Sequence, residues 1–428
     1  MNNYTEKNLI KIARDLFPIN RSITGKGVDH TLAYIKKILP KLKINKIPSN
    51  TKVFDWTVPK EWNVKEAYIK DMKGNEIVNF KKNNLHVMGY SAPIKKILPL
   101  EELIPHLYSI KKQPKAIPFV TSYYKKNWGF CISENEKKKL KKGKYQVYID
   151  SELKNGYLKY GELLIKGKSN KEILFSSNIC HPSMANNELS GLIVLISTIL
   201  ELLKLKKTRL SYRFLFLPET IGSIAYLSKN YKYLQKNILA GYVLSCIGDK
   251  GKFSFIPTRY ENTLSDKVAL FCLKKYRKNF NHYTYLDRGS DERQFNSPGI
   301  DLPISSILRS KYGSYPEYHT SLDNLSIINN KTLNESSEFI FKIISILEIN
   351  QIYGNNKLCE PFLTKYNLYP TISSKNHLFK NTQLILDILS YCDGKNDLID
   401  ISNILNKDIL EINKIILNLI AVKLIKLK

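Results

Sequence analysis

Two histidines follow apolar segments that have the composition of buried strands. His181 comes directly after the segment 172–179, and His319 follows the segment 302–308 after an aromatic loop. In α/β folds, ligands and metal ions collect outside the carboxyl ends of the strands. Because imidazole is the commonest metal ligand among side chains, the two histidines indicate a metal site, although either one alone would equally suit an ordinary polar loop.

Carboxylates follow two further segments of the same kind. Glu219 comes after residues 210–217, and Asp249 comes after residues 240–247. Glu219 is placed to accept a proton from a metal-bound water, or simply to begin a helix whose dipole favours an acid. Asp249 is a candidate oxygen ligand or an ordinary turn residue. Two histidines with carboxylates at successive strand ends form the ligand set expected of a catalytic zinc site with an open position.

A charged loop adds candidates for substrate binding. Residues 289–295, G-S-D-E-R-Q-F, combine three adjacent charges with an apolar anchor. Such a loop is usually solvated, but beside a metal site Asp291, Arg293 or Arg309 would hold the charged end of a substrate. Asp323, four residues after the second histidine, is expected to orient the ring of that histidine.

Alternating strand and helix segments would position these residues. We expect strands at 157–165, 172–179, 210–217, 240–247 and 302–308, and helices at 189–205, 221–235, 264–278 and 333–353. Strands alternating with helices of this length imply crossover connections and a mainly parallel sheet sandwiched by helices. The first two strands are expected to pair with each other, and the helical segments 7–19 and 27–42 are expected to pack on the same sheet.

The sequence pattern changes at both ends of this α/β region. Short alternating runs separated by turn residues indicate a small β-rich domain inserted before it. A Pro-containing linker, 360–375, leads to three helical segments with a tight turn before the third, as in a helix-turn-helix or winged helix. We therefore expect an α/β domain built from residues 1–50 and 160–358, an inserted β-rich domain of residues 51–159, and a winged-helix-like domain of residues 376–428.

The last helical segment, 409–420, decides which partners this tail would suit. Its polar residues are Glu411, Asn413, Lys414 and Asn418, a weak set for reading bases because arginine is the commonest reader of guanine. A docking surface or a homo-oligomer contact is therefore favoured, and nucleic-acid binding stays open.

Composition favours a folded protein whose charge is spread along the chain. The net charge is +29, from 67 Lys+Arg against 38 Asp+Glu, and 43% of residues are apolar. Such an excess can indicate nucleic acid or an anionic membrane, but the lysines are dispersed and not interleaved with aromatic residues. The six cysteines form no CxxC pair and are expected to be reduced. With no signal-peptide pattern and no apolar run of spanning length, the sequence predicts a soluble cytoplasmic protein.

Five motifs together resemble a bacterial family described as aminopeptidase-like. They are H-P-S-x-A-N-x-x-L-S-G, P-E-T-I-G-S, C-I-G-D, G-S-D-E-R-Q-F-x-S-P-G and E-Y-H-T-S-x-D-N-L. The family is a relative of the zinc aminopeptidases and is often found among polysaccharide-biosynthesis proteins. The resemblance covers nearly the whole chain, including F-P-I-N-R-S-I-T-G near the start. It implies a phosphorylase/hydrolase-like α/β sandwich with an inserted β-rich domain and a C-terminal winged helix.

The resemblance also implies roles for single residues and one departure. His181, Asp249 and His319 match the metal ligands, and Glu219 matches the region that holds the general base. The metal-bridging aspartate of an Asp-Asn-x-Ser-Gly motif is replaced by Asn187, followed by Glu188. An amide oxygen cannot offset a second divalent charge, so one zinc ion is expected, with Glu188 as an optional further ligand.

Two interpretations of function follow. The first is a zinc-dependent hydrolase of the aminopeptidase type that acts on a small peptide or on an N-acyl group of a sugar in glycan biosynthesis, with Glu219 as general base. The alternative is a degenerate hydrolase fold that binds or regulates through its winged-helix tail and basic surface. Asn187 and the net charge favour the alternative; the five motifs favour the hydrolase.

Overall fold

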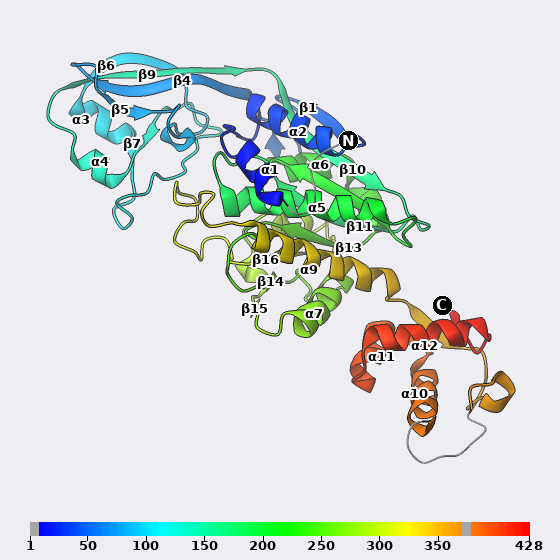
Figure 1. Ribbon diagram of the computed structural model, residues 1–428. Helices are drawn as coiled ribbons and strands as arrows, with labels where there is room; N and C mark the ends of the chain where they lie inside the picture. Colours follow the sequence, from blue (N-terminus) through cyan, green and yellow to red (C-terminus); the bar gives the residue numbers. More distant parts are fainter. Residues whose placement is uncertain (1–7, 370–377) are drawn as a thin grey trace. The chain divides into compact units, whose positions relative to one another are not determined.

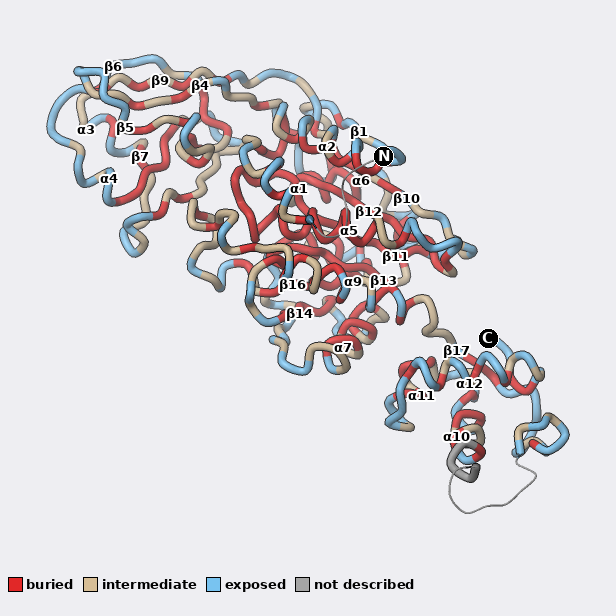
Figure 2. Tube along the Cα trace, viewed as in Figure 1, coloured by how far each residue is buried: buried red, intermediate tan, exposed pale blue. Residues whose placement is uncertain are grey.

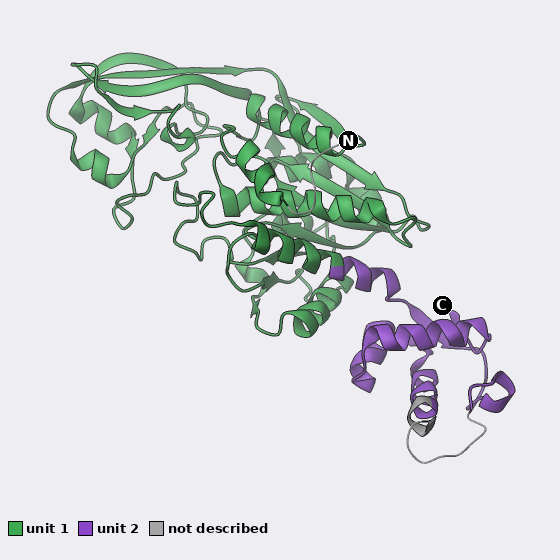
Figure 3. Ribbon diagram, in the orientation of Figure 1, with its two compact units in different colours: residues 1–341 green, residues 342–428 purple. Residues whose placement is uncertain are grey.

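An eight-stranded mixed sheet is the centre of the first of two compact units, residues 1–341 and 342–428 (Figures 1 and 3). This computed structural model describes residues 8–369 and 378–428. The strand order is β1-β10-β12-β11-β13-β16-β14-β15. In that order the strands are Lys43–Pro48, Tyr157–Ile165, Ser211–Leu217, Glu172–Asn178, Ile238–Leu244, Ile304–Leu308, Ser254–Ile256 and Asn281–His282.

The central strands pair in parallel, as the sequence predicts, but one expected pairing is wrong. β11 lies between β12 and β13, and β13 pairs with β16, all in parallel. β10 pairs antiparallel with β12 and with β1 and does not pair with β11. The crossover from β11 through its following helix places β12 beside β11, and β10 then adds to the other edge of β12.

Helices bury both faces of this sheet. Every residue of β11, β12 and β16 is buried, as expected for parallel strands covered on two sides (Figure 2). The longer helices of the first unit are α1 (Leu9–Leu16), α2 (Lys26–Ile38), α5 (Ser190–Lys204), α6 (Ile221–Asn237), α7 (Leu264–Tyr276) and α9 (Asn330–Ile349), which continues into the second unit. Its short helices are α3 (Leu100–Leu103), α4 (Glu134–Lys138) and α8 (Glu292–Phe295). α1 packs against α5 and α2 against β10, which agrees with the expectation that the N-terminal helices pack on this sheet.

The helical segment Ala185–Lys204 has the length and apolar composition of a membrane span. Within the fold, however, 83% of its apolar window is buried, as in the core helix of a globular unit. Its first five residues, Ala185–Leu189, form a π-helical turn before α5 begins. Such turns are rare and often occur at functional sites.

A four-stranded antiparallel sheet with the order β5-β4-β9-β6 lies in the same compact unit. Its strands are Glu76–Asn79, Glu61–Asp71, Lys144–Lys154 and Ile94–Pro99. A loop of this region reaches the α/β sheet, because Phe119 donates its backbone N–H to the carbonyl of His319, and Ser321 donates to Ile117. The boundaries 51–159 of an inserted domain stay a prediction.

In its described residues, the second unit contains the end of α9, a three-stranded sheet and three further helices. The sheet order is β18-β17-β19, with strands Asp393–Asp397, Ile352–Asn355 and Ile425–Leu427. The helices are α10 (Leu378–Tyr391), α11 (Leu398–Leu405) and α12 (Ile409–Ala421). β18 lies between α10 and α11 and pairs antiparallel with β17. Part of the expected linker, and the start of the expected domain at 376, lie outside the described residues.

Candidate active site

The ends of neighbouring parallel strands bring three of the predicted residues to one edge of the sheet. His181 follows β11, Glu219 follows β12, and Asp249 follows β13. β11 and β12 are in register up to their last residues, Asn178 and Leu217. The chains that leave these two strands therefore start side by side.

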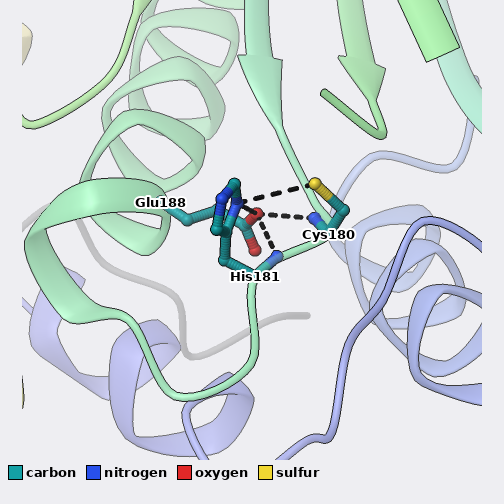
Figure 4. A group of neighbouring side chains, drawn as sticks. All are labelled: Cys180, His181 and Glu188. Atoms are coloured by element: carbon teal, nitrogen blue, oxygen red, sulfur yellow. Dashed lines mark hydrogen bonds and ion pairs between the residues drawn. The ribbon is translucent and has the colours of Figure 1, made fainter. Parts of the chain in front are cut away.

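His181 is buried and held by a carboxylate (Figure 4). Its Nδ1 lies 2.9 Å from Oε2 of Glu188, and its backbone N–H donates to the same oxygen at 2.5 Å. The backbone N–H of Cys180 also donates to this oxygen at 2.5 Å. The other ring nitrogen, Nε2, lies 3.7 Å from Oε2 of Glu219. The bond to Glu188 thus fixes the ring and leaves Nε2 facing Glu219.

Glu188 is fully buried in the π-helical turn, and Arg21 neutralises it. Arg21 donates from Nε to Oε1 of Glu188 at 2.8 Å and to the carbonyl of His181 at 3.0 Å. Burial raises the pKa of Glu188. The bonds and charges of His181 and Arg21 lower it by more than burial raises it, so the pKa of Glu188 lies below its usual value. Sequence reasoning did not single out Arg21, although it belongs to the F-P-I-N-R-S-I-T-G motif noted above.

His319 lies beside His181. The two ring centroids are 5.2 Å apart, and Phe119 lies 5.2 Å from each of them. Tyr318 stacks on His319 at 3.9 Å. The Nε2 atom of His319 is buried and has no hydrogen-bond partner among the described residues. A buried, unpaired ring nitrogen is costly unless a ligand satisfies it.

The two histidines differ in charge. Burial, followed by the charge of His181, lowers the pKa of His319 to about 3. Burial also opposes a charge on His181, but the Cys180 sulfur and the Glu188 carboxylate raise the pKa of His181 well above its ordinary value. His319 is therefore neutral, the form that binds metal ions, whereas His181 holds a proton that a cation would have to displace.

Cys180, His181 and Glu188 form the one group of potential metal-binding side chains whose ligand atoms lie within 4.8 Å of one another in the described part of the chain. Their contacts do not suit an ion. Oε2 of Glu188 already accepts from two backbone N–H groups and from Nδ1 of His181, and Oε1 accepts from Arg21. An ion there would have to replace these bonds. Cys180 and Glu188 therefore hold His181 in position through hydrogen bonds.

The predicted ligand Asp249 is engaged by its neighbours. Its Oδ2 accepts from the amide of Asn186 at 2.9 Å, and its Oδ1 accepts from the backbone N–H of Gly251 at 2.8 Å. Asn187 accepts a weak S–H contact from Cys246 at 3.6 Å through its side-chain oxygen. No described contact joins Asp249 to either histidine.

Asp323 does not orient His319, which corrects the sequence-based expectation. Its two carboxylate oxygens accept from the backbone N–H groups of Asn186 and Asn187, at 2.6 and 2.9 Å, and from the hydroxyl of Tyr315 at 2.9 Å. It therefore caps the start of the π-helical turn. Burial is the main reason that the pKa of Asp323 rises to about 6.

The three predicted substrate-binding residues lie in two places. Asp291 and Arg293 both bond to Thr220, the residue after Glu219. Arg309 instead donates to the Ser336 hydroxyl and to the Glu335 carboxylate of α9. Arg309 also donates to the carbonyl of Gly251, so its guanidinium serves the packing of α9 on the sheet.

The mixed sheet covered by helices, with two histidines and a glutamate at its strand ends, defines an aminopeptidase-like α/β fold. Solved structures at low identity share it. A zinc aminopeptidase from Bacillus subtilis matches with a TM-score of 0.56 at 11% identity, over 80% of this chain and 95% of that chain. A peptidase M28 precursor from Shewanella amazonensis matches with a TM-score of 0.54 at 11% identity, over 83% and 99%.

The chain belongs to the family described as "Domain of unknown function (DUF4910)", which matches residues 10–350, and a winged helix-turn-helix family matches residues 351–427. A Clostridium acetobutylicum protein named "Putative polysaccharide biosynthesis protein with aminopeptidase-like domain" is 45% identical over 93% of this chain and 91% of its own length. A crystal structure of a "putative peptidase" from the same organism matches with a TM-score of 0.90 at 42% identity, over 99% and 96%. The aminopeptidase-like family resemblance and the C-terminal winged helix are thus confirmed.

Proposed function

We propose that this protein is a metal-dependent amide hydrolase of the aminopeptidase type, with Glu219 as its general base. The observation that carries the proposal is the pair of ring nitrogens at the sheet edge. Nε2 of His319 is buried without a partner among the described residues, and Nε2 of His181 faces Glu219 across 3.7 Å. Two imidazoles beside a carboxylate suit a borderline-soft cation such as zinc.

His181 and His319 would hold one zinc ion, and these two side chains fit it. The third protein ligand predicted from the sequence, Asp249, would have to release the amide of Asn186. When bound, such an ion polarises an amide carbonyl and lowers the pKa of water to near neutrality. A single ion is also what Asn187 favours, since an amide offsets no second charge.

The remaining groups prepare the base and the ligands. Ser290 donates its hydroxyl to Oε1 of Glu219 at 2.6 Å, which leaves Oε2 to accept a proton from the attacking water. Glu188 accepts from Nδ1 of His181, so the proton that a cation would displace is the one on Nε2. Arg21 offsets the buried charge of Glu188. Each residue thus acts in its present position.

The proposed substrate is a small peptide or an N-acyl group on a sugar. Amide hydrolysis is supported by the fold shared with zinc aminopeptidases and by the relative named as a peptidase. A sugar substrate is suggested by the relative named for polysaccharide biosynthesis. Both substrates present the same amide carbonyl, so one mechanism serves either.

The test is metal analysis combined with an amide-hydrolysis assay. Protein purified without chelator should contain about one zinc per chain, and it should hydrolyse aminoacyl-amides or N-acetylated sugars. Chelation should abolish turnover, and added zinc should restore it. A preparation without zinc, iron or manganese would remove the basis of the proposal.

The winged helix supports a second candidate function, binding or regulation. Residues 342–428 contain 11 lysines, no arginine and 8 acidic residues, so the positive excess of the chain lies mostly outside this unit. Specific DNA binding depends on phosphate-neutralising charges and on base-reading side chains, with arginine foremost. This composition favours a protein partner. A salt-sensitive gel shift that requires residues 378–428 would instead support nucleic acid.

A further inference from the structure

The segment Gly289–Phe295, a loop that runs into the short helix α8, bonds to Glu219 and to the residue after it at three points. We propose that this loop is a brace that fixes the position of Glu219, and that Asp291 and Arg293 are positioning residues with no contact to substrate. The catalytic meaning of the brace rests on the proposed function, because it assumes Glu219 as base. The brace itself rests on the hydrogen bonds that Ser290, Asp291 and Arg293 form with Glu219 and Thr220.

The feature that requires a brace is the backbone of Thr220. Its φ is 64° and its ψ is −76°, between the end of β12 and the first residue of α6. A positive φ is unfavourable for a β-branched residue, and such strain persists only where the surroundings enforce it. Thr220 directly follows Glu219, so relaxation of this backbone would move the carboxylate.

Asp291 supplies the contact that holds this backbone. Its Oδ1 accepts from the backbone N–H of Thr220 at 2.8 Å and from the hydroxyl of Ser223 at 2.8 Å. Helix α6 has no cap from the side chain of its own N-cap residue, Thr220. The carboxyl group of Asp291 therefore holds the residue before α6 and the third residue of that helix from another part of the chain.

Arg293 and Ser290 hold the two sides of the same turn. Arg293 donates from Nη2 to the hydroxyl of Thr220 at 2.7 Å, which removes that hydroxyl from capping α6. Ser290 donates to Oε1 of Glu219 and itself accepts from the amide of Asn178 at 3.2 Å. Residues at positions 290, 291 and 293 thus bond to one dipeptide, Glu219-Thr220.

The burial of Asp291 indicates that this residue positions Glu219 and does not contact a substrate. Asp291 is completely buried, whereas the side chain of Glu219 is 22% exposed. The Glu219 side chain is thus open to solvent, whereas a substrate cannot reach the Asp291 carboxyl group unless the loop opens. Asp291 therefore acts on the reaction only through Thr220 and Glu219.

A double-mutant cycle between Thr220→Gly and Asp291→Ala tests the brace without reference to activity. Glycine adopts positive φ without a steric penalty, so the backbone of the Thr220→Gly variant no longer needs to be held. Asp291→Ala should lower the urea midpoint in the natural background and lower it by less than half as much beside Thr220→Gly. Asp266→Ala is the matched control, because Asp266 is buried and accepts the backbone N–H groups of Thr258 and Thr263 elsewhere. Its loss should be equal in both backgrounds.

Turnover then tests the link to Glu219. Asp291→Ala should lower kcat by about tenfold or more with little change in KM, because a displaced base slows the chemical step. Asp291→Asn keeps an acceptor oxygen and should retain most of kcat. Additive losses in the cycle, or a rise in KM with kcat unchanged, would overturn the proposal. If the natural protein hydrolyses no amide, the proposed function fails, while the urea cycle still decides whether the brace exists.

Discussion

Nε of Arg21 lies 2.8 Å from Oε1 of Glu188, and both side chains are completely buried. Arg21 comes from the loop between α1 and α2, and Glu188 from the π-helical turn before α5, 167 residues later. Glu188 in turn bonds to His181. Glu188, which directly follows Asn187, therefore orients the first histidine.

Breaking this pair on one side should destabilise the fold. Arg21→Met would leave the Glu188 charge buried without its partner, at a cost of about 3–5 kcal/mol. The double variant Arg21→Met/Glu188→Gln should lose less, because no charge remains uncompensated. Urea denaturation measures both. Arg259→Met, which breaks the partly exposed pair Arg259–Asp301, is the control and should cost under about 1 kcal/mol. Equal losses at the two sites would contradict the role of burial.

Removing one ring nitrogen should weaken the proposed zinc site but leave the fold intact. His319→Gln is expected to weaken zinc binding by about 10-fold or more, since one of three protein ligands is lost. The melting temperature of the metal-free protein should change little, because Nε2 of His319 has no partner among the described residues. His282→Gln, at an exposed histidine, is the control. Isothermal titration with zinc reports the affinity, and unchanged zinc binding in His319→Gln would exclude this histidine as a ligand.

Stability should depend on pH through Asp291. Burial, and then the charge of Glu219, raises the pKa of Asp291 to about 7, whereas an unfolded aspartate ionises near 4. The folded state therefore binds a proton that the unfolded state has released, and stability falls as pH rises from about 4 to 7. Asp291→Asn lacks this titration. The variant should be more stable than the natural protein at pH 8, and this difference should vanish near pH 4. Urea midpoints of chelator-treated protein measure it. A constant difference between the two proteins at all pH values would contradict the raised pKa.

The exposed face of α12 is expected to support self-association. Leu410 and Leu417 are each 56% exposed and, seven residues apart, lie on the same side of the helix. Glu411 and Lys414 flank them and can pair across a symmetric contact. Leu410→Lys/Leu417→Lys should convert dimers to monomers in light-scattering measurements without changing amide hydrolysis. A natural chain that is monomeric at high concentration would rule this surface out.

The parts of the site that the sequence predicts are those encoded locally. Apolar runs that end in polar residues place His181 and Glu219 at strand ends, because buried parallel strands require such runs. The Arg21–Glu188 pair was not predictable, since no local pattern links residues so far apart. The prediction that Asp323 contacts His319 is wrong for the same reason. It rests on nearness in sequence, whereas the Asp323 carboxylate caps a turn more than a hundred residues earlier. The positive φ of Thr220 has no signal in the residue type, because threonine disfavours it.

Position 187 offers the most direct test of the proposed metal site. Asn187 is 5% exposed, and among the described residues its side-chain oxygen accepts a weak contact from the Cys246 thiol at 3.6 Å. Asn187→Asp would bury a carboxylate close to Asp323, so the metal-free variant should unfold at a lower temperature than the natural protein. A cation offsets that charge, and zinc should therefore raise the melting temperature of the variant more than that of the natural chain. If the Asn187 side chain weakens the natural site, the variant should also hydrolyse amide substrates faster than the natural protein. Asn186→Asp and Asn178→Asp are unsuitable as controls, because Asn186 bonds to Asp249 and Asn178 bonds to Ser290. Asn296→Asp, at another buried asparagine, is the better comparison. If zinc stabilises Asn187→Asp no more than the natural protein, residue 187 does not face the metal, and the single-ion site follows from the histidines alone.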